Sequence, residues 1–205
     1  MGIENIRKTS TFESFVPPNE DTMLLVAGLE QLANDLTINI KNNGGFDHSR
    51  LINLYGKPGT GKSHLLEAFV SQIISKGGYE MTEKILFLND KDVGTWRYGL
   101  YNERRVKIVT VDDLFANNKS VNEISSFDLK GFMDCIYRGY ETKQFIFVTS
   151  NFSLSGITEI IAKQDGPGRI TSRLKEMTLS SIKLDGPDYR EIIAAKRIDK
   201  GPFAF

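Results

Sequence analysis

A glycine-rich run at residues 56–63, Gly-Lys-Pro-Gly-Thr-Gly-Lys-Ser, constrains the fold of this chain more than any other segment. It matches the pattern G-x-x-x-x-G-K-[ST] in full. Glycine at the fixed positions lets backbone N–H groups turn inward around phosphate oxygens, and a helix that starts here points its positive end at the same anion. A glycine-rich turn with a chance lysine is the alternative. The predicted phosphate-binding loop comprises Gly56, Lys57, Pro58, Gly59, Thr60, Gly61, Lys62 and Ser63.

The segments on both sides of this run favour the phosphate-binding loop over a chance turn. Residues 51–55 form a short apolar run that is typical of a buried strand, and apolar residues at helical spacing follow the loop until Gly77. In this setting Lys62 would reach the β- and γ-phosphates of a nucleotide, and the Ser63 hydroxyl would bind Mg²⁺. The sequence therefore predicts that the chain binds ATP or ADP together with Mg²⁺.

Apolar runs and helical patterns alternate along the whole chain. The predicted strands are 51–55, 85–88, 106–111, 145–148 and 178–184. The predicted helices are 25–40, capped by Asp21, and then 66–77, 121–140, 157–163, 169–174 and 187–196. Continuous rather than alternating apolar strands indicate a parallel sheet covered on both faces. We therefore predict an α/β fold in three layers, α/β/α, with a five-stranded parallel sheet over residues 21–197, after an extended lead-in at 1–20 and before a flexible tail at 198–205.

Two carboxylates, Asp112 and Asp113, end the predicted third strand. In nucleotide-hydrolysing proteins with this loop, an Asp at the end of that strand holds Mg²⁺, which fits Asp112. Asp113 is then placed to orient or polarise the attacking water. The alternative is an Asp-Asp pair that simply starts a turn.

Polar residues also follow the predicted fourth strand, namely Thr149, Ser150 and Asn151. Ligands of parallel α/β sheets lie outside the carboxyl ends of the strands, so these side chains are expected in the same crevice as Lys62 and Asp112. Asn151 is the candidate for a hydrogen bond to the γ-phosphate or to the attacking water. Ordinary turn chemistry is the alternative for the Ser-Asn pair.

Three arginines further along are candidates for stabilising transition-state charge. Arg169 and Arg173 are four residues apart on one predicted helix face, and Arg190 opens the last predicted helix. Arg173 is expected to face away from its own phosphate loop and to act on a neighbouring subunit. A solvated helix face is the alternative for each of them.

Composition narrows the function classes. Lys+Arg and Asp+Glu are both 26, so the net charge is zero, which argues against coating nucleic acid by bulk charge. The single cysteine, Cys135, cannot form an internal disulfide and fits a reducing, cytoplasmic location. We expect neither a signal peptide nor a membrane partner, because the start has no basic residue before an apolar run and the longest apolar runs are far below the ~20 residues of a membrane span.

Two segments leave their role open. The stretch between residues 90 and 107 mixes aromatic residues such as Trp96 with arginines such as Arg97, a combination that stacks on and pairs with single-stranded nucleic acid. A connector whose aromatics pack inward is the alternative. The end of the chain at 201–205 carries two phenylalanines, either as a docking peptide or as a tail that packs back.

Taken in order, these motifs resemble the AAA+ branch that holds the initiator DnaA, the helicase loader DnaC and the DnaA regulator Hda. The resemblance covers about residues 11–197, and the combination of motifs carries it. The motifs are Thr-Phe-Glu-Ser-Phe at 11–15, Gly-Lys-Pro-Gly-Thr-Gly-Lys-Ser-His at 56–64, Val-Asp-Asp-Leu at 111–114, Val-Thr-Ser-Asn at 148–151, Ser-Arg-Leu at 172–174 and Asp-Tyr-Arg at 188–190.

The resemblance implies a role for each matching residue. Lys62 and Ser63 would be the Walker A residues, in a motif that extends to His64, and Asp112 and Asp113 would be Walker B. Asn151 would be sensor 1, Arg173 the arginine finger and Arg190 a residue similar to sensor 2. The adenine pocket would use the lead-in, near Phe15, Val16 and Pro17.

The resemblance also implies a setting, which is DNA replication. A DnaC-like loader of the replicative helicase is the favoured function, with slow ATP hydrolysis in the absence of partners, and a phage or mobile element is one of its candidate sources beside a cellular host. The expected partners are a replicative helicase or a DnaA-like initiator, with single-stranded DNA as a further candidate and weak ATP-dependent self-association. A DnaA- or Hda-like regulator, a transposition helper ATPase and a non-catalytic nucleotide-binding adaptor remain as alternatives. About ten residues precede the lead-in, so a helicase-binding domain like that of the loaders is not expected.

Overall fold

A computed structural model of the chain describes residues 6, 7, 9–93 and 105–192. Five strands in this part form one sheet in the order β2-β3-β4-β1-β5, and every neighbouring pair is parallel. The strands are β1 (Arg50–Tyr55), β2 (Ile85–Asn89), β3 (Ile108–Leu114), β4 (Phe145–Ser150) and β5 (Thr178–Lys183). The predicted five-stranded parallel sheet is therefore confirmed.

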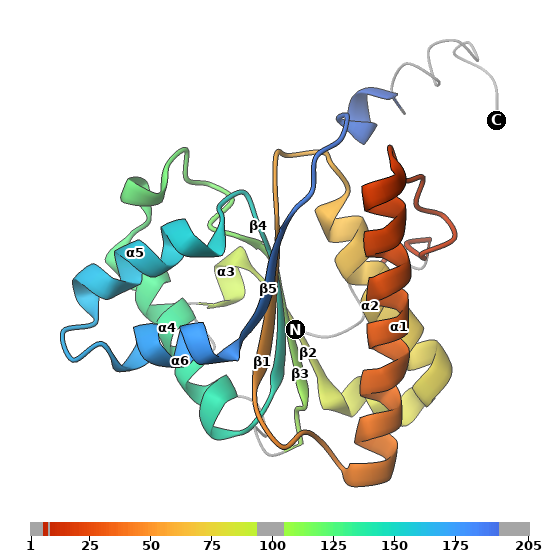
Figure 1. Ribbon diagram of the computed structural model, residues 1–205, viewed down its shortest axis with the longest axis horizontal. Coiled ribbons are helices and arrows are strands. Elements are labelled where there is room, and N and C mark those ends of the chain that lie inside the picture. The colour runs from red at the N-terminus through yellow and green to blue at the C-terminus, as the bar shows by residue number, and fades with distance from the viewer. Residues whose placement is uncertain (1–5, 8, 94–104, 193–205) are drawn as a thin grey trace.

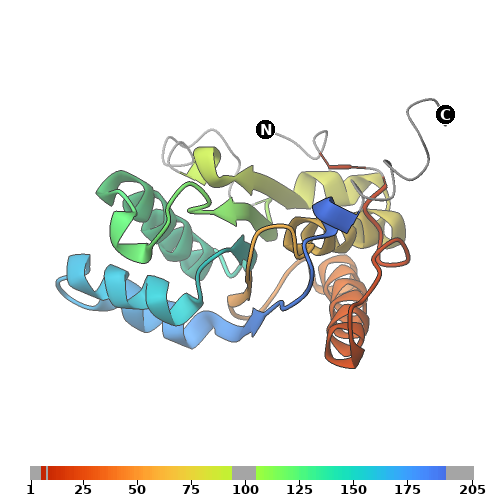
Figure 2. The same cartoon turned by 90° about the horizontal axis from the view of Figure 1, so that it is seen from above.

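Helices cover both faces of the sheet and complete the three layers (Figure 1). On one face lie α1 (Glu20–Asn43) and α2 (Lys62–Gly77), which pack against each other. On the other face lie α3 (Asp90–Val93), α4 (Ser126–Glu141), α5 (Leu154–Gln164) and α6 (Arg169–Met177). Two 3₁₀ helices, Tyr79–Lys84 and Val121–Glu123, connect these elements. Seen from above, the red-to-orange α1 and the green-to-blue α4 to α6 lie on opposite sides of the strands (Figure 2).

The core has two parts, one on each face of the sheet, because β1, β2, β3 and β4 bury side chains in both directions. Under α1 and α2, the ring of Phe69 stacks on Phe145 and meets the edge of Phe147, with ring centroids 5.9 and 5.1 Å apart. On the other face, Phe115 and Phe132 meet edge to face at 5.9 Å. This packing fixes the strands and so fixes the positions of the loops at their ends.

Three predictions about elements need correction. Helix α1 is capped by Asn19, not Asp21, because Asn19 Oδ1 accepts hydrogen bonds from both the N–H and the hydroxyl of Thr22. Helix α4 begins at Ser126, not near 121, because the Ser125 hydroxyl accepts the N–H of Asp128 and starts the helix there.

The third correction concerns the fifth strand. β5 alternates half-buried and exposed residues instead of running as a continuous apolar strand. It lies at the edge of the sheet and pairs only with β1 among the described strands, so every second side chain of β5 stays exposed to solvent.

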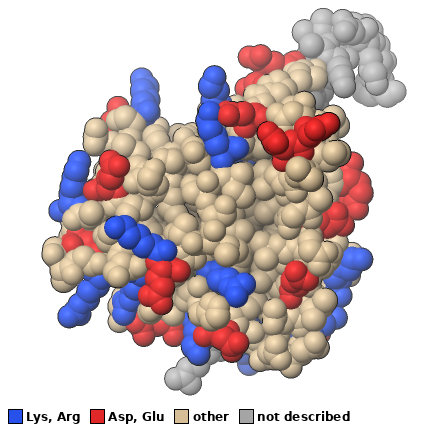
Figure 3. Space-filling view, in the orientation of Figure 1, with Lys and Arg blue, Asp and Glu red and all other residues tan. Residues whose placement is uncertain are grey.

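Some predictions lie outside the described residues: the aromatic and basic residues at 96–101, the end of the last predicted helix and the tail at 198–205. On the face seen in Figure 3, basic and acidic side chains are interspersed, as expected for a chain with zero net charge. Within the described part, no helix has the length and apolar character that crossing a membrane requires.

Candidate nucleotide-binding site

The predicted site residues other than Arg173 come together at the carboxyl ends of the strands. The phosphate-binding loop follows β1, the two aspartates end β3, and Asn151 follows β4. These three strands are parallel neighbours in the order β3-β4-β1, so their ends lie side by side. The sequence pattern anticipated this arrangement, and the close contacts below show how it is built.

Glycine is required in the loop by both backbone conformation and space. Gly59 and Gly61 have φ angles of 80° and 94°, in the left-handed region that other residues avoid. A Cβ on Gly61 would also run into the ring of Phe15. Helix α2 begins directly afterwards at Lys62, so its N-terminal N–H groups open into the loop.

Lys62 lies inside the loop, with only 4% of its surface exposed. Its Nζ donates hydrogen bonds to the carbonyl oxygens of Gly56 and Lys57, at 3.0 and 2.8 Å, and to Asn151 Oδ1 at 3.2 Å. Burial lowers the pKa of the Lys62 ammonium, while the charges of Asp113 and Asp112 act in the opposite direction. The Walker A lysine and the sensor 1 candidate therefore touch.

Asp112 is held from the neighbouring strand. Thr149 Oγ1 donates a hydrogen bond of 2.6 Å to Asp112 Oδ1. Burial raises the pKa of the Asp112 carboxyl above its ordinary value, and the hydrogen bond from Thr149, with a smaller influence of the Ser63 side chain, opposes that shift. The contact ties the end of β3 to the end of β4.

The pair formed by Ser63 and Asp112 fits Mg²⁺. Both offer oxygen atoms, and Mg²⁺ in nucleotide sites binds one or two carboxylates together with substrate phosphates. The described residues contain no cluster of three or more His, Cys, Asp or Glu side chains that would enclose a metal by themselves. The donor set therefore suits an ion completed by phosphate oxygens.

Asp113 has an unusual backbone, with φ of 54°. Its N–H donates to Thr149 Oγ1 at 2.8 Å. The pairing of β3 with β4 is irregular between Val111 and Leu114, so the two aspartates sit where the regular ladder breaks. Such strain needs support from neighbouring groups.

The lead-in packs onto the loop but forms a closed aromatic cluster in this structure. The ring of Phe15 is 7% exposed and lies 5.5 Å from the ring of His64 and 5.7 Å from that of Tyr189. The Val16 side chain is 70% exposed, and its carbonyl accepts a hydrogen bond from the Tyr189 hydroxyl. The lead-in is therefore close to the loop, as expected for an adenine pocket, and its role in binding adenine stays a prediction.

The closing Asp-Tyr-Arg turn also lies on the phosphate loop. The N–H of Tyr189 donates to the carbonyl of Gly59 at 3.0 Å, and a Cβ on Gly59 would meet the Asp188 carboxylate. The side chain of Arg190 is exposed, and its charge contributes to lowering the pKa of Lys62. This places the sensor-2 candidate near the lysine.

Arg173 lies elsewhere. Its Nη2 donates to Glu141 Oε1 at 2.6 Å, and its guanidinium stacks over Tyr137 and Tyr140, 4.5 and 5.0 Å from the ring centroids. Glu141 is the last residue of α4 and is followed by the start of β4, so Arg173 lies near the amino ends of the strands, whereas the phosphate loop lies at their carboxyl ends. The orientation away from its own loop agrees with the expectation, and the arginine-finger role stays a prediction.

Sequence reasoning missed two contacts. The first is the hydroxyl of Thr149, which forms hydrogen bonds with both aspartates. The second is the buried Glu67 carboxylate on α2, which accepts hydrogen bonds from Arg7 at 2.8 Å and from Ser10 at 2.6 Å. The polar tip of the fourth strand was a usable signal for Thr149. For Glu67 no local signal exists, because its partners are 60 and 57 residues away.

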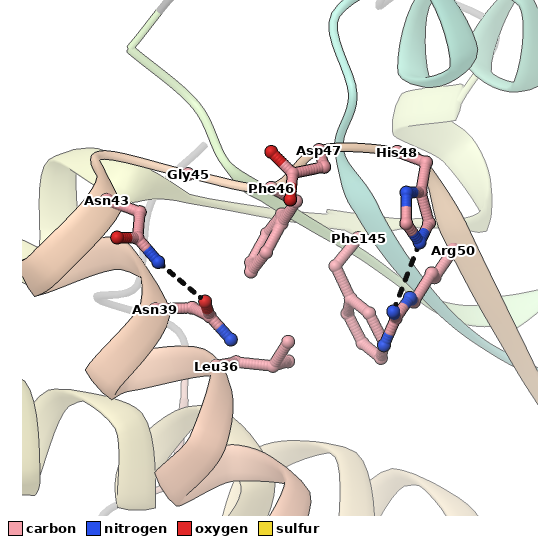
Figure 4. A pocket seen from close by; sticks show the side chains of 9 residues that line it. All are labelled: Leu36, Asn39, Asn43, Gly45, Phe46, Asp47, His48, Arg50 and Phe145. Carbon is pink, nitrogen blue, oxygen red and sulfur yellow. Dashed lines mark hydrogen bonds between the residues drawn. The ribbon is translucent and has the colours of Figure 1, made fainter.

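A cavity of about 430 Å³ lies at the amino ends of β1 and β4, at the opposite end of these strands from the phosphate-binding loop. It opens between the C-terminal end of α1, the loop before β1 and the start of β4 (Figure 4). Arg50 Nη2 lies 3.2 Å from His48 Nε2 on its wall, and Phe46 and Phe145 contribute apolar surface. It contains none of the predicted site residues.

Comparisons with known proteins now bear on this geometry. Residues 52–152 match the family model described as RNA helicase. The chain is 30% identical over 166 residues to the chromosomal replication initiator protein DnaA of Buchnera aphidicola subsp. Baizongia pistaciae (strain Bp). That match covers 77% of this chain and 33% of the relative, so the chain spans a third of the length of this curated protein.

Solved structures share the fold at low identity. A crystal structure of DnaI has a TM-score of 0.61 at 16% identity and covers 92% of this chain and 93% of its own. The DnaC helicase loader has a TM-score of 0.57 at 16% identity, with 87% and 98% covered. The initiator DnaA bound to AMPPCP and single-stranded DNA has a TM-score of 0.56 at 20% identity, with 95% and 56% covered.

The loop after β1, the acidic end of β3 and the polar end of β4 on a five-stranded parallel sheet define a P-loop domain of the AAA+ type. The chain is a AAA+ domain of the branch that contains DnaA and DnaC, on the combined likeness in sequence and fold. The resemblance drawn from its motifs is confirmed.

Proposed function

We propose that the chain is an ATPase that binds ATP with Mg²⁺ and converts ATP and water to ADP and phosphate. One observation carries the proposal: the buried Lys62 of the glycine-rich loop donates a hydrogen bond of 3.2 Å to Asn151, and it lies close enough to Asp112 and Asp113 for their charges to act on its pKa. The carbonyl and amide partners of Lys62 are groups that phosphate oxygens could replace. The AMPPCP held by a DnaA of the same fold supports this proposal.

Each residue has a defined role in the proposed reaction. Backbone N–H groups of the loop and Lys62 bind the phosphates, while Ser63 and Asp112 hold Mg²⁺, which neutralises charge that develops on the phosphates. Asp113 orients the attacking water, and Asn151 contacts the γ-phosphate or that water. Arg190 approaches the phosphates from the closing turn.

The test is nucleotide binding and turnover by the full chain, with and without EDTA. The proposal expects that ATP and ADP bind, that Mg²⁺ strengthens binding and that phosphate is released slowly. An Asp112→Asn variant should lose the effect of Mg²⁺ and keep nucleotide binding in EDTA. Failure of the wild-type chain to bind either nucleotide would end the proposal.

The setting we propose is DNA replication in the cytoplasm, as a DnaC-like loader of the replicative helicase. The likeness to DnaI and to the DnaC helicase loader supports it over nearly the whole chain. The likeness in sequence to DnaA supports the runner-up, a replication regulator or transposition helper that acts on a DnaA-like initiator. Purification from the source cells separates the two, because a loader co-purifies with the replicative helicase and a regulator with the initiator.

We also propose weak self-association in the presence of ATP, with Arg173 acting on the nucleotide of a neighbouring copy. Such head-to-tail contacts build rings or open helices. The support is the position of Arg173 on the side of the domain away from its own loop. ATP turnover per molecule should then rise with protein concentration.

A further inference from the structure

We infer that Thr149 is a positioning residue for the acidic pair, whose single hydroxyl fixes both Asp112 and Asp113 in their working geometry. The inference rests on the proposed ATPase function, and it assigns to β4 a second task besides carrying Asn151. The role follows from hydrogen bonds between β4 and β3, whereas the Val-Thr-Ser-Asn motif that contains Thr149 assigned a role only to Asn151.

The hydroxyl of Thr149 is used in both directions. Oγ1 donates to Asp112 Oδ1 at 2.6 Å and accepts the N–H of Asp113 at 2.8 Å. A threonine hydroxyl has one proton to donate, so the bond to Asp112 leaves no other direction for it. Thr149 has no exposed surface, so water cannot replace either partner without a change in packing.

The backbone of β3 explains why this support is needed. The ladder between β3 and β4 is irregular between Val111 and Leu114, and Asp113 has φ of 54°. The next residue of β4, Ser150, donates its hydroxyl to the carbonyl of Leu114 at 2.8 Å. Two side-chain hydroxyls of β4 thus replace the missing ladder contacts and hold the strained turn.

The consequence for the site is geometric. With one carboxylate oxygen of Asp112 bound to Thr149, the orientation of that carboxylate toward the expected Mg²⁺ is fixed. With the Asp113 N–H bound as well, the water-orienting carboxylate starts from a fixed backbone. Loss of the hydroxyl should therefore impair the Mg²⁺-dependent steps and spare the phosphate contacts made by the loop.

The experiment compares two variants of Thr149 with a matched control in the full chain. Thr149→Val keeps the shape and removes the hydroxyl, whereas Thr149→Ser keeps the hydroxyl and removes the methyl group. Thr110→Val is the control, because Thr110 is a buried threonine of β3 whose hydroxyl points to the carbonyl of Leu86 and not to the site. Thermal melts show that each variant is folded.

The readouts are ATP turnover and the Mg²⁺ concentration needed for tight binding of a fluorescent ATP analogue. Thr149→Val should lower kcat by about tenfold or more, the loss expected for a hydrogen bond to a charged group, with little change in KM or in nucleotide affinity in EDTA. It should also need several times more Mg²⁺. Thr149→Ser and Thr110→Val should stay within about twofold of the wild type.

Equal behaviour of Thr149→Val and the wild type would overturn the inference. Equal damage in the Val and Ser variants would also overturn it, because it would mean that any change of packing at this position impairs the site and that the hydroxyl has no particular role. If the wild type binds no nucleotide, the proposed function fails and the positioning role fails with it. If the wild type binds nucleotide and Thr149→Val has the same ATP turnover and Mg²⁺ requirement as the wild type, only the positioning role is refuted.

Discussion

Replacing Lys62 by alanine tests the nucleotide site most directly. The structure shows a lysine that is 4% exposed and donates three hydrogen bonds of 2.8 to 3.2 Å inside the loop. These donors point into the space between the loop and Asn151, where phosphate would bind. A hydrogen bond to a charged group contributes about 1.5–3 kcal/mol, so Lys62→Ala should weaken ATP and ADP binding by about tenfold to a hundredfold.

The assay is a titration of nucleotide by calorimetry or fluorescence, in the presence of Mg²⁺. Lys76→Ala is the matched control, because Lys76 is an exposed lysine at the far end of the same helix and removes the same charge. The control should bind as the wild type does. Equal nucleotide affinity in Lys62→Ala and the wild type would refute the assignment of the loop as a phosphate cradle.

The other predictions concern hydrolysis, assembly and backbone strain. Asp113→Asn should bind nucleotide normally and hydrolyse ATP at least about tenfold more slowly, and a wild-type rate would contradict its role with water. Arg173→Ala should abolish the rise of specific ATPase activity with protein concentration. Glu141→Gln removes only the ion-pair partner of Arg173 and should keep that rise. If both variants lose the rise, Arg173 has a structural role instead. Gly61→Ala should lower the free energy of unfolding by about 1–2 kcal/mol or more, because Gly61 has φ of 94° and faces the buried ring of Phe15. Gly28→Ala, on an open part of α1, should raise the free energy of unfolding slightly, and calorimetry measures both changes.

Much of the fold and the site could be predicted from the sequence because the signals are local. The pattern of the loop at 56–63 is by itself typical of phosphate binding. Short apolar runs followed by Asp112 or Asn151 predict that those side chains lie at the carboxyl ends of parallel strands. Strand periodicity and glycine positions act over a few residues, so a linear pattern records them. The order of the strands, β2-β3-β4-β1-β5, then brings the three strand ends together.

Tertiary structure decided what depends on distant partners. Thr149 meets Asp112 across 37 residues, and Glu67 meets Arg7 across 60. The polar end of the fourth strand predicts that Thr149 lies near Asp112 but not that its hydroxyl bonds both aspartates, and no local pattern predicts the Glu67 bond. The cap of α1 was mistaken for another reason: Asn19 and Asp21 are both good caps by type, and only the structure shows that Asn19 Oδ1 accepts the N–H of Thr22. The sequence by itself determined which chemistry this protein carries, since motif and periodicity are local properties of the chain. Which hydroxyls and carboxylates hold that chemistry in place was decided only when packing of the sheet brought remote residues within hydrogen-bond distance.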